Sequence, residues 1–316
     1  MINFIYKLYF NSKKKTLFGK VDFWGRLYAL LIRNLMPIYY KLKAKFTHKN
    51  KPTNNSIQVI VSLTSYPGRI NIVWQSIESI LHQTFKPSKV ILWLATDQIP
   101  NTNHLPSSLK RLMKRGLLIE FREDIRPHKK YYYAMKEYPD SIIITIDDDV
   151  LYPSDMIKNF VDFHHRYPYS VICNGTRLIK SDENGFAKYK EWKNWHATEI
   201  ESIPRYDILP LGVMGVLYPP KSLNERVFDV DLIRRLCLNA DDLWLKAMAI
   251  KQKTTSVLTN SYSRPFIEIQ NSQATSLMAT NVTQNQNDKQ VAAINNELGV
   301  FEDYKNLMIE NELTNI

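Results

Sequence analysis

The ten residues from Ile144 to Pro153, ITIDDDVLYP, give the first indication of both a fold and a functional site. An apolar run, typical of a buried strand, ends there in three consecutive acids, Asp147, Asp148 and Asp149. If all three were ionised and shielded from water, they would repel one another strongly. Either a divalent cation or exposure to solvent must therefore relieve the repulsion.

Upstream of the aspartates, segments typical of strands alternate with segments typical of helices. We expect strands at residues 57–63, 89–95, 117–122 and 141–146, and helices at 71–83, 106–116 and 129–138. Such alternation predicts an α/β fold with a mostly parallel, Rossmann-like sheet and flanking helices. Ligands of such sheets bind beyond the carboxyl ends of the strands, which is where the aspartates are expected.

Downstream the pattern is less regular. Ser154 can cap a helix over 154–167, and further elements are expected at 170–176 (strand), 240–252 (helix) and 291–309 (helix). Residues 259–296 are rich in Asn, Gln, Ser and Thr, which predicts a loop over the site or a loosely ordered tail. We therefore divide the chain into an N-terminal segment (1–50), a globular domain (51–258) and a polar loop with a C-terminal helix (259–316).

The net charge of +11 is concentrated in the N-terminal segment. Residues 1–50 hold 11 Lys or Arg and one acid, Asp22, whereas residues 51–316 hold 31 basic and 30 acidic side chains. Aromatic and leucine residues are interspersed among these lysines, which is typical of a helix at the surface of an anionic membrane. The alternative is a basic helix that packs on the domain. Nucleic-acid binding is disfavoured, because no recognised motif accompanies the charge.

The two cysteines and the apolar runs indicate the cellular compartment of the protein. Cys173 and Cys237 lie in apolar contexts far apart in sequence, which indicates a reduced intracellular protein rather than a disulfide framework. The best apolar run of the N-terminal segment, residues 27–40, is short and contains Arg33 and Pro37, so it is not expected to span a membrane. We expect a cytoplasmic protein that is peripherally associated with the inner face of the membrane.

The aspartate triplet is a candidate metal site. Side chains alternate along a strand, so Asp147 and Asp149 are expected to point the same way and Asp148 the opposite way. Two carboxylates on one face suit Mg²⁺ or Mn²⁺, which takes its remaining oxygens from water and from substrate phosphates. Lys129 and Lys130 begin the helix expected at 129–138, where they could meet a diphosphate; a solvated basic turn is the alternative.

A second acidic pair, Asp241 and Asp242, begins the helix expected at 240–252. The helix dipole alone favours acids at this place, so the pair is by itself ambiguous. Four stretches in order nevertheless make the chain resemble a glycosyltransferase of the A fold, close to family 2. They are VIVSLTSYPGRI (59–70), QSIESILHQTFKPSKVIL (75–92), IIITIDDDV (142–150) and NADDLWL (239–245), and the resemblance covers about residues 57–250.

The resemblance implies transfer of a sugar from a nucleotide-sugar donor, with a UDP-sugar as the default, to a saccharide or lipid-linked acceptor. Carried over by motif, Asp147 lies near the ribose and the metal, Asp149 ligates the metal, and Asp242, beside Asp241, is the catalytic base. The resemblance implies that Thr64, Tyr66 and Arg69 line the nucleotide pocket. With Asp97 and the residues considered above, the candidate donor-binding set is Thr64, Tyr66, Arg69, Asp97, Lys129, Lys130, Asp147 and Asp148. Asp97 departs from the family, which commonly has a pair of acids followed by Gly-Ser at that strand end.

Three alternatives remain open. The two acidic motifs also resemble exostosin-type transferases, which retain anomeric configuration and would not need Asp242 as a base. A phosphatase of the haloacid dehalogenase type shares an apolar strand that ends in Asp-x-Asp, but it has Thr or Val where this chain has Leu151. The third alternative is a membrane-associated binding protein that is catalytically inactive.

Overall fold

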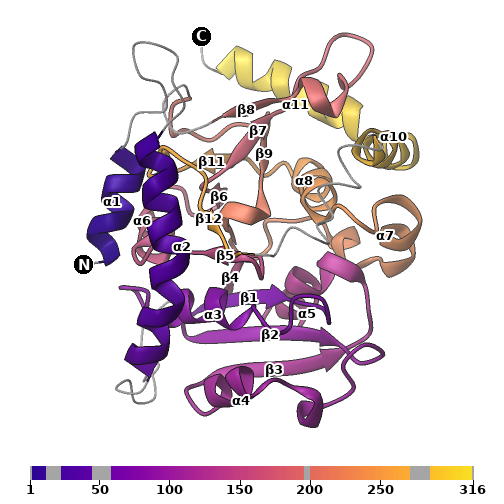
Figure 1. Ribbon diagram of the computed structural model, residues 1–316. Coiled ribbons are helices and arrows are strands. Elements are labelled where there is room, and N and C mark those ends of the chain that lie inside the picture. The colour runs from indigo at the N-terminus through magenta and orange to yellow at the C-terminus, as the bar shows by residue number, and fades with distance from the viewer. Residues whose placement is uncertain (1, 12–22, 45–57, 196–199, 271–284, 315–316) are drawn as a thin grey trace.

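A seven-stranded sheet forms the centre of the protein (Figure 1). The structure is a computed structural model that describes residues 2–11, 23–44, 58–195, 200–270 and 285–314. In spatial order the strands are β11 (Ser256–Leu258), β6 (Val171–Cys173), β10 (Val216–Tyr218), β4 (Ile142–Thr145), β1 (Val59–Thr64), β2 (Lys89–Ala95) and β3 (Leu117–Arg122). All neighbouring pairs are parallel except those of β10, which runs against both β4 and β6. The expected mostly parallel sheet is confirmed.

Helices cover both faces of the sheet because its strands are apolar on both sides. On one face, Val59, Val61 and Leu63 of β1 share a core with helices α3 (Trp74–Leu81), α4 (Ser107–Met113) and α6 (Met156–Arg166). On the other face, Ile60 packs with Ala134 of α5 (Lys129–Glu137). The alternation of β1 side chains between two cores is the period of a strand buried on both faces.

The helix expected to begin at Ser154 begins later. Helix α6 starts at Met156 with Asp155 as its N-cap residue, and no side chain caps it. The backbone carbonyl of Ser154 instead accepts a hydrogen bond from the Thr84 amide, at 2.7 Å. The expectation of a serine cap was therefore wrong, because this residue belongs to the turn that joins α6 to the loop after α3.

A second core lies under the C-terminal half of the chain. Its helices are α7 (Val230–Leu236), α8 (Asp241–Lys251), α10 (Gln286–Leu298) and α11 (Val300–Thr314), and a small antiparallel sheet adds β7 (Thr176–Leu178), β8 (Lys193–Trp195) and β9 (Ile208–Pro210). Short 3₁₀ turns are η1 (Thr102–His104), η2 (Arg126–His128), η3 (Tyr189–Glu191), η4 (Gly212–Met214) and η5 (Glu225–Phe228).

The last expected helix is two helices. Gly299 separates α10 from α11 in a left-handed conformation (φ 62°), which glycine adopts without strain. Ile294, Leu298 and Tyr304 are buried in the second core, so both helices are part of the packed protein. The polar stretch 259–296 thus contains a strand, β12 (Ile267–Glu268), and most of α10; its residues 271–284 lie outside the described part of the chain.

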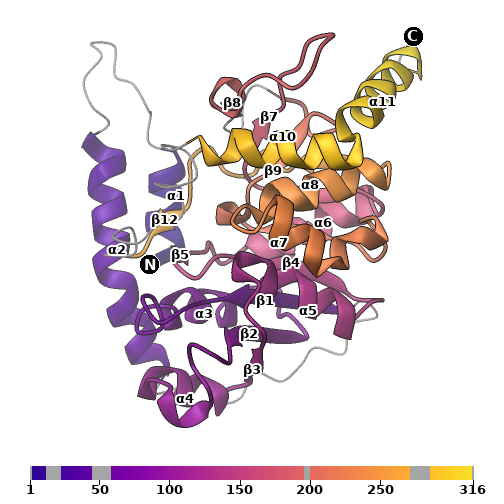
Figure 2. The same cartoon turned by 90° about the vertical axis from the view of Figure 1, so that its right-hand side faces the viewer.

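The N-terminal segment forms two helices that pack on the domain. Helices α1 (Ile2–Asn11) and α2 (Phe23–Ala44) lie on the side of the molecule away from α10 and α11 (Figure 2). Tyr6, Ile32 and Met36 are buried against the strand pair formed by β12 and β5 (Val150–Leu151). The Tyr6 hydroxyl donates to the Leu151 carbonyl at 3.1 Å. The expected helical segment is present, and it packs as the alternative of a domain-bound helix requires.

Among the helices that the structure describes, none is both long and apolar enough to cross a bilayer.

The packing of α2 can be tested by opening a cavity beneath it. Ile32→Ala and Met36→Ala, at residues 1% and 2% exposed, should each lower the free energy of unfolding by about 2–5 kcal/mol. Leu30→Ala, on the outward side of the same helix, should change it little. Chemical denaturation measures the three values. Equal, small effects at all three positions would show that α2 does not pack on the domain.

Candidate active site

The three aspartates lie where β4 ends, at the edge expected from the sequence. β4 ends at Thr145, and the Ile146 amide still donates to the Ser62 carbonyl of the neighbouring β1, at 3.1 Å. Asp148 and Asp149 then form a turn that leads into β5. The strand alternation used to orient the side chains does not extend into this turn. Consequently Asp148 and Asp149 are oriented toward one partner and Asp147 toward another.

Arg69 is the common partner of Asp148 and Asp149. Its two terminal nitrogens lie 2.8 Å from Asp148 Oδ1 and 3.0 Å from Asp149 Oδ2. Ser65 Oγ donates to the other oxygen of Asp148, at 2.6 Å. Because β1 and β4 are parallel neighbours, the loop that follows β1 meets the loop that follows β4, and this brings Ser65 and Arg69 to the acids.

Lys130 connects the triplet to the second acidic pair. Lys130 is buried, with 4% of the residue exposed. Its ammonium lies 2.7 Å from Asp147 Oδ1 and 2.9 Å from Asp241 Oδ2. Lys130 belongs to the first turn of α5, whereas Asp241 opens α8. The structure thus joins two acidic motifs, far apart in sequence, through one buried cation.

Asp242 is held by backbone. Its two carboxylate oxygens each accept from the Gly212 amide, at 3.1 Å, and the side chain is partly exposed whereas Asp241 is buried. A Cβ at Gly212 would lie 3.0 Å from both Asp242 Oδ1 and Lys130 Nζ. A larger residue at 212 would therefore push the carboxylate and the ammonium apart.

Burial and mutual repulsion set the protonation of the site. Burial, with Asp147 as the next contributor, raises the pKa of Asp149 to about 7 although Arg69 opposes the shift. Burial and Asp241 likewise raise the pKa of Asp242. Burial alone would favour a neutral Lys130, but Asp147, Asp241 and Asp242 together raise its pKa well above the usual value. Lys130 therefore stays a cation, whereas Asp149 and Asp242 titrate nearer to neutral pH than an ordinary carboxyl group does.

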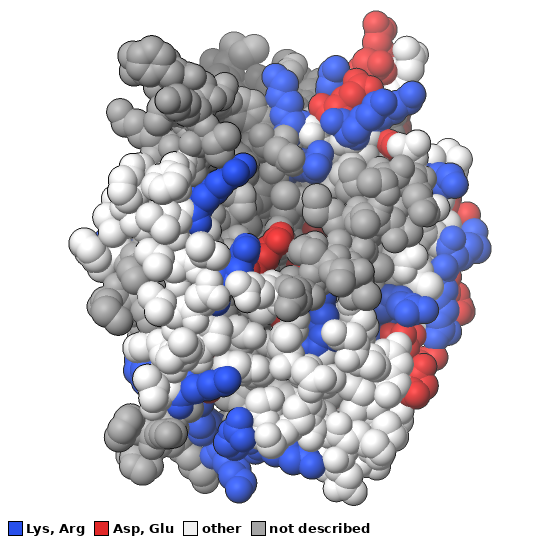
Figure 3. All heavy atoms as spheres, in the orientation of Figure 1, with Lys and Arg blue, Asp and Glu red and all other residues white. Residues whose placement is uncertain are grey.

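The three aspartates differ in how far they are exposed to solvent. Figure 3 shows acidic side chains at the bottom of a depression, on the face that also carries α2. Asp147 is the most accessible side chain of the triplet, at 31% exposed against 7% for Asp148 and 8% for Asp149. A ligand that approaches the triplet from solvent would therefore meet Asp147 first.

The other candidate residues lie at varying distances from this network. Thr64, at the end of β1, donates to the Trp93 carbonyl at 2.9 Å, and the ring of Tyr66 lies 5.8 Å from the Arg69 guanidinium. Asp97 is exposed in the turn after β2. Lys129 is ion-paired with Asp124, so it and Lys130 have different partners although they are neighbours in sequence.

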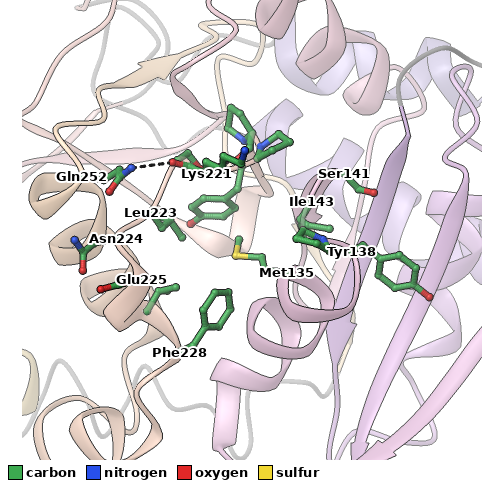
Figure 4. A pocket seen from close by; sticks show the side chains of 16 residues that line it. Met135, Tyr138, Ser141, Ile143, Lys221, Leu223, Asn224, Glu225, Phe228 and Gln252 are labelled. Atoms are coloured by element: carbon green, nitrogen blue, oxygen red, sulfur yellow. Dashed lines mark hydrogen bonds between the residues drawn. The ribbon is translucent and has the colours of Figure 1, made fainter.

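A cavity of about 450 Å³ lies away from the acids. It opens between α5 and residues 218–228, beside Ser141 and Ile143 at the start of β4, whereas the aspartates follow the end of that strand (Figure 4). Met135, Tyr138 and Phe228 contribute much of its wall, and one hydrogen bond joins Gln252 Nε2 to the Lys221 carbonyl at 3.2 Å. It does not coincide with the candidate active site.

Two residues of the network were not among the candidates from the sequence. Ser65 could have been found, because it follows the strand expected at 57–63, whose carboxyl end shares an edge with the aspartates. The role of Gly212 had no signal in the sequence. It depends on β10 running antiparallel to β4, so that the loop before β10 reaches the same edge.

One known protein family matches part of the chain. Residues 64–216 match the model of the family described as glycosyl transferase family 2. No curated protein sequence matches the chain.

The solved proteins that are similar in structure include the following two. One is the mannosyltransferase PcManGT from Pyrobaculum calidifontis in complex with GDP-Man and Mn²⁺, at 15% identity over 84% of this chain and 73% of that one, with a TM-score of 0.44. The other is S. aureus TarS 1-349, at 12% identity over 66% of this chain and 59% of that one, with a TM-score of 0.39; it is also similar in its complex with UDP.

Removal of the central cation should destabilise the fold in a pH-dependent way. Lys130→Met leaves Asp147, Asp241 and Asp242 without their shared cation, so we expect a loss of about 3–5 kcal/mol in unfolding free energy at pH 7.5. A carboxyl group whose folded pKa is raised holds a proton that the unfolded chain has released. Stability therefore falls as pH rises from about 4 toward the raised value, and acidification to pH 5 should restore part of it.

Lys129→Met is the matched control. The partner of Lys129 is Asp124, whose pKa is lowered on balance by the hydrogen bond and charge of Lys129 although burial opposes the shift. In this variant Asp124 keeps the Arg126 amide and guanidinium as partners, so stability should show little pH dependence between 5 and 7.5. Denaturation curves at the two pH values compare the variants. An equal pH response in both would mean that the Lys130 carboxylates are not coupled as described.

Proposed function

Because residues 64–216 match the model of glycosyl transferase family 2, we propose that the chain transfers a sugar from a nucleotide-sugar donor to a saccharide or lipid-linked acceptor. A UDP-sugar is the donor we favour, and the product is a surface polysaccharide or glycolipid of a bacterial type. The observation that supports this best is the network in which Lys130 joins the acids after β4 to those that open α8.

We propose that residues 51–258 carry the reaction, although residues after 258 share their core. Donor binding is assigned to the edge formed by the loops after β1, β2 and β4. Thr64, Tyr66, Arg69, Asp97 and Asp148 would line the nucleotide there, and Lys129 and Lys130 would favour its diphosphate by their charge. The S. aureus TarS structure is described with UDP and PcManGT with GDP-Man, which is consistent with a nucleotide-linked donor.

The side chains of the site supply some, but not all, of the ligands that a hard divalent cation needs. In the ion pairs of the described residues, Arg69 and Lys130 each contact two carboxylates. Four negative charges thus face two positive ones, and negative charge is in excess. No group of three or more acidic, His or Cys side chains in the described ranges could hold a metal alone. Mn²⁺ or Mg²⁺ would thus be held by Asp147 and Asp149 with the remaining oxygens from donor and water. Such an ion would stabilise the charge of the departing diphosphate.

Asp242 is our candidate base. It is partly exposed, the Gly212 amide orients it, and its raised pKa places proton uptake nearer to neutral pH than for an ordinary carboxyl group. Asp241 is buried on Lys130, so we assign it the role of holding that cation. This division favours an inverting reaction, in which Asp242 accepts the proton of the acceptor hydroxyl. In a retaining reaction Asp242 would contact a sugar instead.

We also propose that the protein works at the cytoplasmic face of an anionic membrane. Residues 1–50 carry 11 basic side chains and one acid, and each basic side chain close to an anionic leaflet contributes about 1 kcal/mol at most. The packing of α1 and α2 on β5 and β12 changes how this is tested. Deletion of residues 1–50 would uncover core residues such as Leu151, so surface substitutions are the cleaner variants.

Metal dependence gives the first test. Activity should require Mn²⁺ or Mg²⁺, and Asp149→Ala should abolish it while the protein stays folded, because the change removes one proposed ligand. Asp140→Ala, at the exposed other end of β4, should be fully active. Release of nucleoside diphosphate from several nucleotide sugars is the measurement. Full turnover by Asp149→Ala in EDTA would refute the metal assignment, inorganic phosphate would indicate a phosphatase, and no product with any donor would indicate a binding protein.

The base gives the second test. Asp242→Asn keeps the hydrogen bonds from Gly212 within reach but removes proton uptake, so turnover should fall about 10²- to 10⁴-fold with donor affinity little changed. Steady-state kinetics with donor and acceptor separate kcat from KM. An unaltered kcat would show that Asp242 is only an acid at the start of a helix.

A further inference from the structure

Helix α2 is apolar on the side that faces away from the protein as well as on the side that it buries. Of the 13 large hydrophobic side chains that are exposed in the described residues, eight belong to α1 and α2. They are Phe4, Phe23, Trp24, Leu30, Leu31, Leu35, Ile38 and Leu42. Single exposed apolar residues are ordinary, but a concentration of this kind on one element marks a contact surface.

Five of these residues form one continuous stripe. Trp24, Leu31, Leu35, Ile38 and Leu42 recur at the spacing of a helix face, and each is between 37% and 58% exposed. At 1.5 Å per residue the stripe is about 27 Å long. The buried residues Ile32, Met36 and Tyr40 lie on the other side of the helix, against the domain. We name the five exposed residues the outer stripe.

The surroundings of the outer stripe favour an anionic bilayer as its partner. Arg26, Lys41 and Lys43 are exposed on the same helix, and the segment that contains it has ten more basic than acidic residues. A second copy of the chain would bring two such segments together and repel. Near one end of the stripe, the rings of Phe23, Trp24 and Tyr28 lie in contact, and aromatic groups of this kind prefer the membrane–water interface.

We propose that the outer stripe is a bilayer-docking surface through which α2 lies in the headgroup and upper acyl region of an anionic membrane. This rests on the membrane association proposed above and adds to it: apolar insertion, rather than charge alone, holds the protein. Because the opposite face of α2 is packed along β12 and α3, the helix has one side for the domain and one for lipid.

Helix α2, which carries the outer stripe, is connected to the candidate metal-binding loop through β12 and β5. Arg33 Nε of α2 donates to the Glu268 carbonyl of β12 at 3.0 Å. β12 pairs with β5, and the Ile269 amide donates to the Asp149 carbonyl at 2.7 Å. β12 and β5 connect α2 to the Asp149 backbone, so a membrane-docked α2 keeps the candidate metal-binding loop close to the lipid surface. An acceptor anchored in that bilayer would need no long reach.

The test removes the stripe and leaves every basic residue. In the full chain, Leu31→Ser, Leu35→Ser and Ile38→Ser together should weaken binding to vesicles of phosphatidylglycerol and phosphatidylcholine about tenfold or more. The matched control carries three substitutions of the same kind at exposed positions outside α2, namely Leu118→Ser, Ile203→Ser and Ile309→Ser. It should bind the vesicles as the unaltered chain does. At about 1 M salt, where charges are screened within 3 Å, only chains with an intact stripe should stay bound.

A second readout reports insertion itself. Among the tryptophans whose exposure the structure describes, Trp24 alone is exposed, so lipids brominated on the acyl chain should quench its fluorescence, and Trp24→Phe should remove that quenching. Equal vesicle binding by the stripe variant and the unaltered chain, or no quenching of Trp24, would overturn the proposal. So would a dimer in solution that the stripe variant converts to a monomer, because a second copy would then be the partner.

The donor-cleavage assay without vesicles separates this proposal from the catalytic one. The stripe variant should release nucleoside diphosphate at the rate of the unaltered chain, since the substituted side chains are exposed on α2 and belong to none of the ion pairs described for the acidic network. Loss of vesicle binding with unchanged cleavage supports docking. If no variant and no donor gives nucleoside diphosphate while the stripe still controls binding, the docking proposal stands and the enzymatic one fails.

Discussion

The contact of the Lys130 ammonium with Asp147 and Asp241 is the interaction on which the rest of the site depends. A cation buried at this depth is stable only because several carboxylates surround it. The buried carboxylates in turn are stable only because the cation balances part of their charge. The contact also joins the first turn of α5, the loop after β4 and the start of α8. The mutual positions of the two acidic motifs are thus set by electrostatics as much as by the sheet.

Much of the architecture could be predicted from the sequence. The strands between Ile57 and Ile146 alternate with helices, and apolar runs such as those of β1 and β4 are long enough to indicate burial on both faces. The edge at which the aspartates lie follows from that alternation, since parallel strands end together. The residues recognised by motif, Arg69, Asp147 and Asp242, all belong to the network that the structure contains.

What could not be predicted was the direction of individual side chains. Strand periodicity placed Asp147 and Asp149 on one face, but β4 ends at Thr145 and the turn that follows sends Asp148 and Asp149 to Arg69. Neighbouring lysines at the start of α5 diverge for a similar reason, because successive helix positions point about 100° apart and only Lys130 faces the acids. The amide of Gly212 reaches Asp242 through the antiparallel placement of β10, for which a single sequence offers no local signal.

The docking of the N-terminal helices on residues near the other end of the chain has a consequence for how the protein is made. Tyr9 of α1 bonds to the carbonyl of Pro265, a separation of 256 residues, and Arg33 bonds to Glu268 across 235. During synthesis α1 and α2 emerge before their partners on β12, which follow the whole central sheet. For that interval both apolar faces of α2 are uncovered. The nascent chain therefore exposes these apolar faces until β12 has been made, and contacts of such long range make the last step of folding slow.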